Sequence, residues 1–75
     1  MFSSDALARI RARVQAVTGI VLPYAIDVTK GTGLCVTLED GRAQMAAQDE
    51  NALARGYFLL SRCVKEGKKT LKVCQ

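Results

Sequence analysis

The side chains best suited to acid–base chemistry in this chain are seven carboxylates. They are Asp5, Asp27, Glu39, Asp40, Asp49, Glu50 and Glu66. General acid–base catalysis needs two such groups that converge in a cleft with separated pKa values. Three of the seven instead suit helix starts, one suits a turn and two suit a solvated surface, which leaves Asp27 alone without a structural role. We therefore predict no catalytic residue.

Three cysteines, Cys35, Cys63 and Cys74, are the candidate thiol nucleophiles and metal ligands. The chain has no histidine, so nothing activates Cys63, and a zinc site would lack its usual ligand set. The count is odd and there is no C-x-x-C pair, which argues against a disulfide framework. We therefore expect three reduced thiols in a cytoplasmic protein, at least one of them partly exposed, and neither a metal site nor a cofactor.

Four lysines, Lys65, Lys68, Lys69 and Lys72, form the densest positive patch of a chain whose net charge is +4 and whose pI is about 9.3. Such a patch can bind nucleic acid, but it also suits the negative end of a helix and a solvated strand. The basic excess is modest, and we do not expect nucleic acid to be the partner.

Composition limits what these groups can do. At 75 residues, with 49% hydrophobic and 24% charged residues, the chain suits one small folded domain over residues 1–75 with no deep cavity of its own. The first residues lack the continuous apolar core of a signal peptide, and no apolar run has the length of a membrane span. We expect no membrane association and a monomer when the chain is isolated.

The first expected element is a helix that begins at Ser3 or Ser4. Its inner stripe would recur at helical spacing, and Gly19 would end it. The stripe consists of Leu7, Ile10, Val14 and Val17.

The second expected element is a strand within residues 20–29, rich in β-branched and aromatic residues. Pro23 cannot donate a ladder hydrogen bond, so the strand should be an edge, be bulged, or begin after the proline. We favour an edge strand.

Residues 34–47 predict a β-hairpin around a two-residue type I′ turn at Asp40-Gly41. That turn pairs Leu38 with Ala43, Val36 with Met45 and Leu34 with Ala47 on one wholly apolar face. The opposite face is mostly polar, as expected of a hairpin with one buried side.

A second helix should follow, with Asp49 as its N-cap and Gly67 as its C-cap. Its inner stripe is Leu53, Tyr57, Leu60 and Val64. Gly56 lies within that stripe, where a side chain would hold the helix away from the sheet.

Residues 68–75 resume the alternation of a strand, in which we expect Leu71 and Val73 to face inward. The predicted order of elements is therefore α-β-β-β-α-β. We expect an α+β two-layer sandwich with a mainly antiparallel four-stranded sheet and both helices on one face.

The segment from Gly31 to Val73 resembles the small domain that precedes the catalytic barrel in family 20 glycoside hydrolases, the β-N-acetylhexosaminidases. In that family two strands with alternating apolar residues precede a helix of the form G-x-x-x-G-x-x-x-L-x-x-L. The matching positions are Leu34, Val36 and Leu38; Ala43, Met45 and Ala47; and Ala52, Gly56, Leu59 and Leu60. Ala52 stands where the family often has glycine, and Met45 replaces a β-branched residue.

The resemblance implies a non-catalytic accessory domain, because the family's catalytic Asp-Glu pair lies on a barrel that these residues do not contain. The partner would be that barrel, in a parent that hydrolyses N-acetylhexosaminides. One alternative is a small basic RNA-binding domain, since double-stranded RNA-binding domains share the α-β-β-β-α order. Those domains have lysines at the start of their second helix, where this chain has Asp49 and Glu50. An independent protein-interaction module is a further alternative.

The helical layer is the predicted contact with the barrel. An outward phenylalanine can anchor such a contact, and small residues in a row permit close approach. The predicted contact residues are Ala8, Ala12 and Ala16 on the first helix and Ala54, Phe58 and Arg62 on the second.

Overall fold

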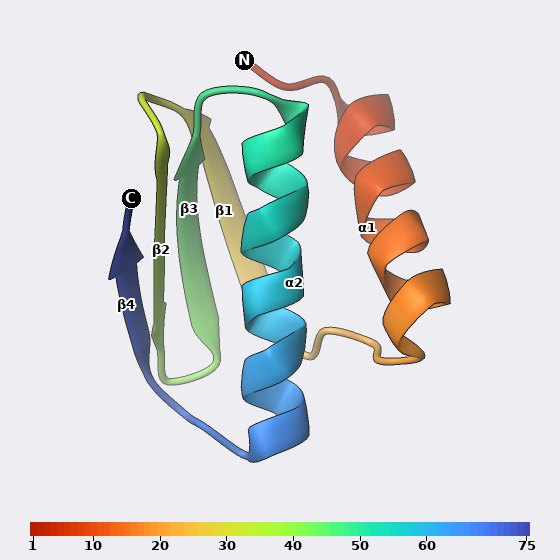
Figure 1. Cartoon of the computed structure of the whole chain (residues 1–75), viewed down its shortest axis with the longest axis vertical. Coiled ribbons are helices and arrows are strands. Elements are labelled where there is room, and N and C mark those ends of the chain that lie inside the picture. The colour runs from red at the N-terminus through yellow and green to blue at the C-terminus, as the bar shows by residue number, and fades with distance from the viewer.

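Two helices and four strands follow one another in the predicted order α-β-β-β-α-β (Figure 1). This computed structural model describes all 75 residues. The elements are α1 (Ser4–Thr18), β1 (Ala25–Lys30), β2 (Leu34–Glu39), β3 (Arg42–Ala47), α2 (Glu50–Glu66) and β4 (Leu71–Cys74).

The β2–β3 hairpin has the predicted turn and register. Asp40 and Gly41 both have positive φ, 50° and 76°, as a type I′ turn requires. Leu34 pairs with Ala47, and the two other predicted apolar pairs are also present. All six residues of these pairs are buried, so burial of one hairpin face fixes the register.

The sheet is mixed, with the strand order β1-β3-β2-β4. β2 pairs antiparallel with β3 and with β4, whereas β1 pairs parallel with β3. Two of the three strand pairings are thus antiparallel, as expected, and the pairing of β1 with β3 makes the sheet mixed. The short link at residues 31–33 turns the chain from β1 into β2, and the hairpin then inserts β3 between those two strands. β3 consequently runs in the same direction as β1.

β1 lies at an edge, as predicted, and it begins only after Pro23. Residues 20–24, which the sequence included in the strand, lie outside it because the proline has no N–H to donate. Leu22 is nevertheless buried, whereas Ile26 and Val28 on the inner face of β1 are only half-buried.

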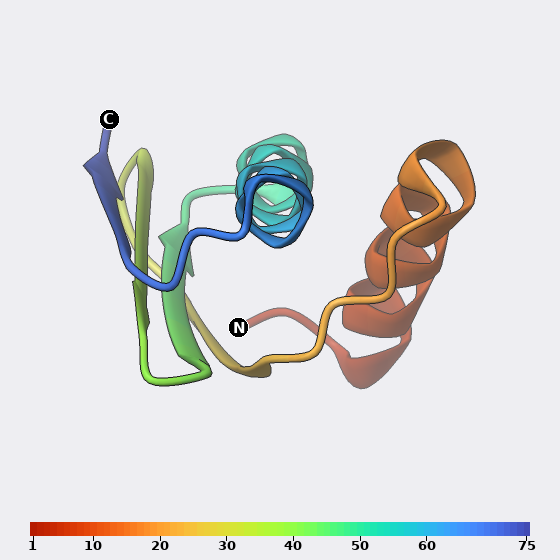
Figure 2. The same ribbon diagram turned by 90° about the horizontal axis from the view of Figure 1, so that it is seen from below.

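The helices pack differently. α2 contacts β2 and β3, whereas α1 contacts α2, and Figure 2 shows α2 between the strands and α1. Ile10 and Val14 of α1 are buried, but Val17 is 68% exposed. The prediction that Val17 belongs to the inner stripe is therefore wrong: α1 rests on one helix, which covers a narrower stripe than a sheet would.

Gly56 faces the sheet, as the sequence predicted. A Cβ built there would overlap the Met45 sulfur and lie 2.9 Å from Met45 Cε. Glycine therefore lets α2 approach β3 closely, which compensates for its cost of about 1 kcal/mol in mid-helix.

Candidate docking surface

Local capping fixes where both helices begin and end. The Ser3 hydroxyl accepts a hydrogen bond of 3.1 Å from the Ala6 N–H, and the Asp49 carboxylate accepts one of 2.9 Å from the Ala52 N–H. Gly19 and Gly67 close the two helices in the left-handed conformation, with φ of 71° and 70°. These caps confirm the predicted helix boundaries, and they determine the length of the surface between α1 and α2.

Two depressions lie along the boundary between the helices, and both contain Val17 and Phe58. The first is lined by Arg9, Ile10, Arg13, Val14, Val17, Glu50, Asn51, Ala54 and Phe58. The second is lined by Val17, Thr18, Ile20, Phe58, Ser61, Arg62, Lys65 and Glu66. Phe58 is 39% exposed, so about two fifths of this aromatic residue is open to solvent. We call these two depressions together the helical groove.

The rim of the helical groove is predominantly basic. Arg9 donates hydrogen bonds of 3.0 and 3.3 Å to Glu50 Oε1, which joins the first turn of α2 to α1. Arg13, Arg62 and Lys65 line the groove without forming an ion pair. A partner that places carboxylates beside an apolar contact would therefore complement this surface.

The structure brings together only part of the predicted contact set. The α2 residues Ala54, Phe58 and Arg62 all line the groove. The α1 residues do not, since they are exposed on the face of α1 opposite Ile10 and Val14. Those α1 residues are Ala8, Ala12 and Ala16. The two predicted stripes are therefore separate surfaces.

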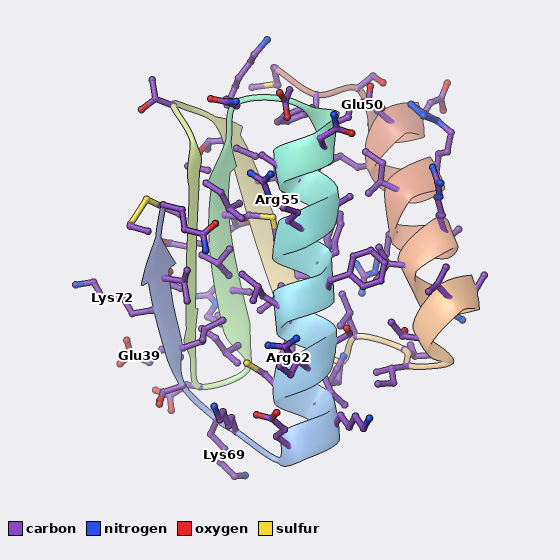
Figure 3. All side chains as sticks on the ribbon, viewed as in Figure 1. Glu39, Glu50, Arg55, Arg62, Lys69 and Lys72 are labelled. Atoms are coloured by element: carbon purple, nitrogen blue, oxygen red, sulfur yellow. A yellow bond between two sulfur atoms is a disulfide. The ribbon has the colours of Figure 1, made fainter.

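The lysine patch is mixed in charge. Lys68 forms an ion pair of 3.3 Å with Glu66, and Lys68 and Lys72 share a depression with Glu39 and Asp40. Figure 3 shows Lys72 and Glu39 on the β4 side of the sheet, remote from the helical groove. The chain brings together no group of three or more His, Cys, Asp or Glu residues that could hold a metal ion.

The cysteine prediction is wrong. Cys35 of β2 and Cys74 of β4 form a disulfide, and the buried Cys63 is the one free thiol. Both bonded cysteines alternate with inward-facing valines, Val36 and Val73, so the sequence placed both on the outer face. The sequence did not show that β4 pairs with β2, and this pairing places Cys35 directly opposite Cys74.

Burial raises the pKa of three groups. Desolvation is the largest cause for Tyr24, Tyr57 and Cys63, and a nearby Lys68 partly offsets it at Cys63. A raised pKa keeps the Cys63 thiol and both phenols protonated at neutral pH, which is the opposite of nucleophile activation.

No protein-family model matches this chain, and no curated protein sequence is significantly similar to it. Neither helix is long and apolar enough to cross a membrane.

Proposed function

We propose that this chain is a non-catalytic accessory domain of a hexosaminidase-type glycoside hydrolase, and that its helical side packs against a catalytic barrel. The proposal places α1 and α2 on the same side of the sheet, with α2 nearer the strands, and the barrel would contact the surface that the two helices form together. In the family that the sequence resembles, the helical layer lies between the sheet and the barrel.

The observation that carries the proposal is the distribution of exposed apolar side chains. The large exposed hydrophobic residues are Met1, Val17, Val21 and Phe58. The last three belong to α1, to the loop after it and to α2, and none of the four lies on a strand. A partner that buries apolar surface therefore gains most on the helical side.

The roles of the carboxylates support a non-catalytic domain. Asp49 caps α2, Glu50 pairs with Arg9, and Glu66 pairs with Lys68. Glycoside hydrolysis normally needs an acid and a second carboxylate on either side of a scissile bond. Hydrolysis of N-acetylhexosaminides would belong to the barrel.

The proposal includes a monomeric isolated chain and excludes nucleic acid as the principal partner. A cytoplasmic location stays an expectation from the sequence, and disulfides are more typical of oxidising compartments.

The test is binding of the purified chain to a separately purified family 20 catalytic barrel, followed by calorimetry. We expect Phe58→Asp to weaken the complex at least about tenfold, as loss of an interface anchor does. Gln44→Asp on the outer sheet face is the matched control and should bind like the unsubstituted chain. Equal loss in both variants, or no complex with the unsubstituted chain, would contradict the proposal.

Two further assays distinguish the alternatives. The isolated chain should not turn over a chromogenic N-acetylglucosaminide, and turnover abolished by one carboxylate substitution would make it an enzyme. Binding of duplex RNA should vanish at physiological salt if it depends on the lysines alone. A submicromolar RNA complex at that salt would favour the RNA-binding alternative.

A further inference from the structure

β4 is the shortest strand of the sheet. It has four residues, lies at an edge and pairs with β2 alone. Its inward side chains, Leu71 and Val73, are only half-buried, whereas Lys72 and Cys74 are exposed. α2 lies over β2 and β3, so noncovalent packing holds β4 weakly.

The ladder between β2 and β4 brings two cysteines together. Leu34 and Gln75 exchange backbone hydrogen bonds, with N···O distances of 3.2 and 2.7 Å. The neighbouring pair, Cys35 and Cys74, is therefore a non-hydrogen-bonded pair, in which facing side chains are closest. Their Cα atoms are 4.1 Å apart, and their sulfurs are bonded.

The disulfide is open to a reagent from solution. Cys74 is exposed and Cys35 is half-buried, and Figure 3 shows the sulfur–sulfur bond on the side of the sheet away from α2. Lys72 lies on the same outer face two residues before Cys74, where its charge attracts an approaching thiolate.

No thiol of the chain itself competes for this bond. Cys63 is 2% exposed in α2, on the opposite side of the sheet. Burial also raises its pKa, so the thiolate needed for exchange is scarce.

We propose that Cys35–Cys74 is a thiol-exchange site that latches β4 to β2, and that a dithiol reductant releases this strand. One reductant thiolate attacks Cys74 Sγ, which forms a mixed disulfide and expels the Cys35 thiolate, which then takes up a proton. The second reductant thiol attacks the mixed disulfide and expels the Cys74 thiolate, which is protonated in turn. The reductant is oxidised to its own disulfide, and two electrons pass to the two cysteines.

The rest of the domain stays folded in the reduced state because its core does not depend on β4. The largest fully buried side chains are Leu34, Met45, Leu53, Leu60, Val14, Val36 and Cys63. None of them belongs to β4. Reduction therefore uncovers one edge of β2, a row of backbone groups able to pair with another strand.

The experiment combines intact mass with hydrogen–deuterium exchange of the full chain, before and after treatment with dithiothreitol under native conditions. Before treatment the mass should lack two hydrogens, and one thiol should be alkylated only after denaturation. After treatment the amides of β4 should exchange at nearly the unstructured rate. Amides of β3 and α2 should remain at least about 100-fold slower than that rate.

Two variants test whether the Cys35–Cys74 disulfide itself controls exchange of the β4 amides. Cys35→Ser combined with Cys74→Ser should show the open β4 without reductant. Cys63→Ala should respond to dithiothreitol as the unsubstituted chain does. Three free thiols at the outset, resistance to native reduction, or persistent protection of β4 in the reduced protein would each overturn the proposal. Loss of protection throughout the chain would also overturn it, because the disulfide would then hold the whole fold.

Discussion

The two helices are alike locally and differ in position. α1 has 15 residues and α2 has 17, each begins with a side-chain cap, and each ends at a left-handed glycine. α2 nevertheless has seven buried residues and α1 three, because α2 lies between the sheet and α1 (Figure 2). Helix formation thus follows local signals, whereas a helix's share of the core depends on how many of its sides are covered.

The largest expected difference between the helices comes from truncating one core residue in each. Leu60→Ala in α2 should destabilise the fold by about 4 kcal/mol and Ile10→Ala in α1 by about 2 kcal/mol, since cavities in enclosed sites relax least. Leu60 is 0% exposed and Ile10 is 7% exposed. Urea unfolding at equilibrium measures both values. Equal losses would mean that α1 is as integral to the core as α2.

Gly56 tests how closely α2 approaches the sheet. Gly56→Leu should cost about 1–3 kcal/mol, because the new side chain would displace the buried Met45. Arg55→Leu, at the exposed neighbouring position, is the control and should change stability by less than about 0.5 kcal/mol. An unchanged melting temperature for Gly56→Leu would show that α2 can move outward without cost.

The caps provide a matched comparison of the two helices. Ser3→Ala and Asp49→Ala should each cost about 1 kcal/mol. Loss of the Asp49 cap should lower the melting temperature, because α2 cannot fray at its start without uncovering Leu53. Loss of the Ser3 cap should mainly speed hydrogen exchange in the first turn of α1. A purely local effect of Asp49→Ala would contradict the central role of α2.

The smallest effect is expected at the ion pair that joins the helices. The Arg9 and Glu50 side chains are 61% and 52% exposed, so Arg9→Ala should cost less than about 0.5 kcal/mol, and added salt should reduce that cost. Thermal unfolding at low and high salt measures it. A salt-independent loss above about 1 kcal/mol would show that the pair sets how α1 docks on α2.

Much of the fold could be predicted because its signals are local. Asp40-Gly41 fixed the hairpin turn, the alternation from Leu34 to Ala47 fixed its register, and Asp49 marked the start of α2. The parallel placement of β1 was not predictable in this way, because it depends on β3 inserting between β1 and β2.

The candidate site was predicted in part for the same reason. The spacing of Ala54, Phe58 and Arg62 on one helix is a local property, and all three line the groove. Whether the alanines of α1 lie beside these three residues depends on how α1 is rotated against α2. The residue pattern of neither helix contains that rotation.

The sequence by itself determined the order of elements, the hairpin register and the helix ends, because backbone conformation and alternation act between near neighbours. Tertiary structure alone decided which elements became neighbours. Cys35 and Cys74 are separated by 39 positions in the sequence, and only the pairing of β4 with β2 sets them face to face. The same dependence on distant contacts exposed Val17 and created the groove around Phe58.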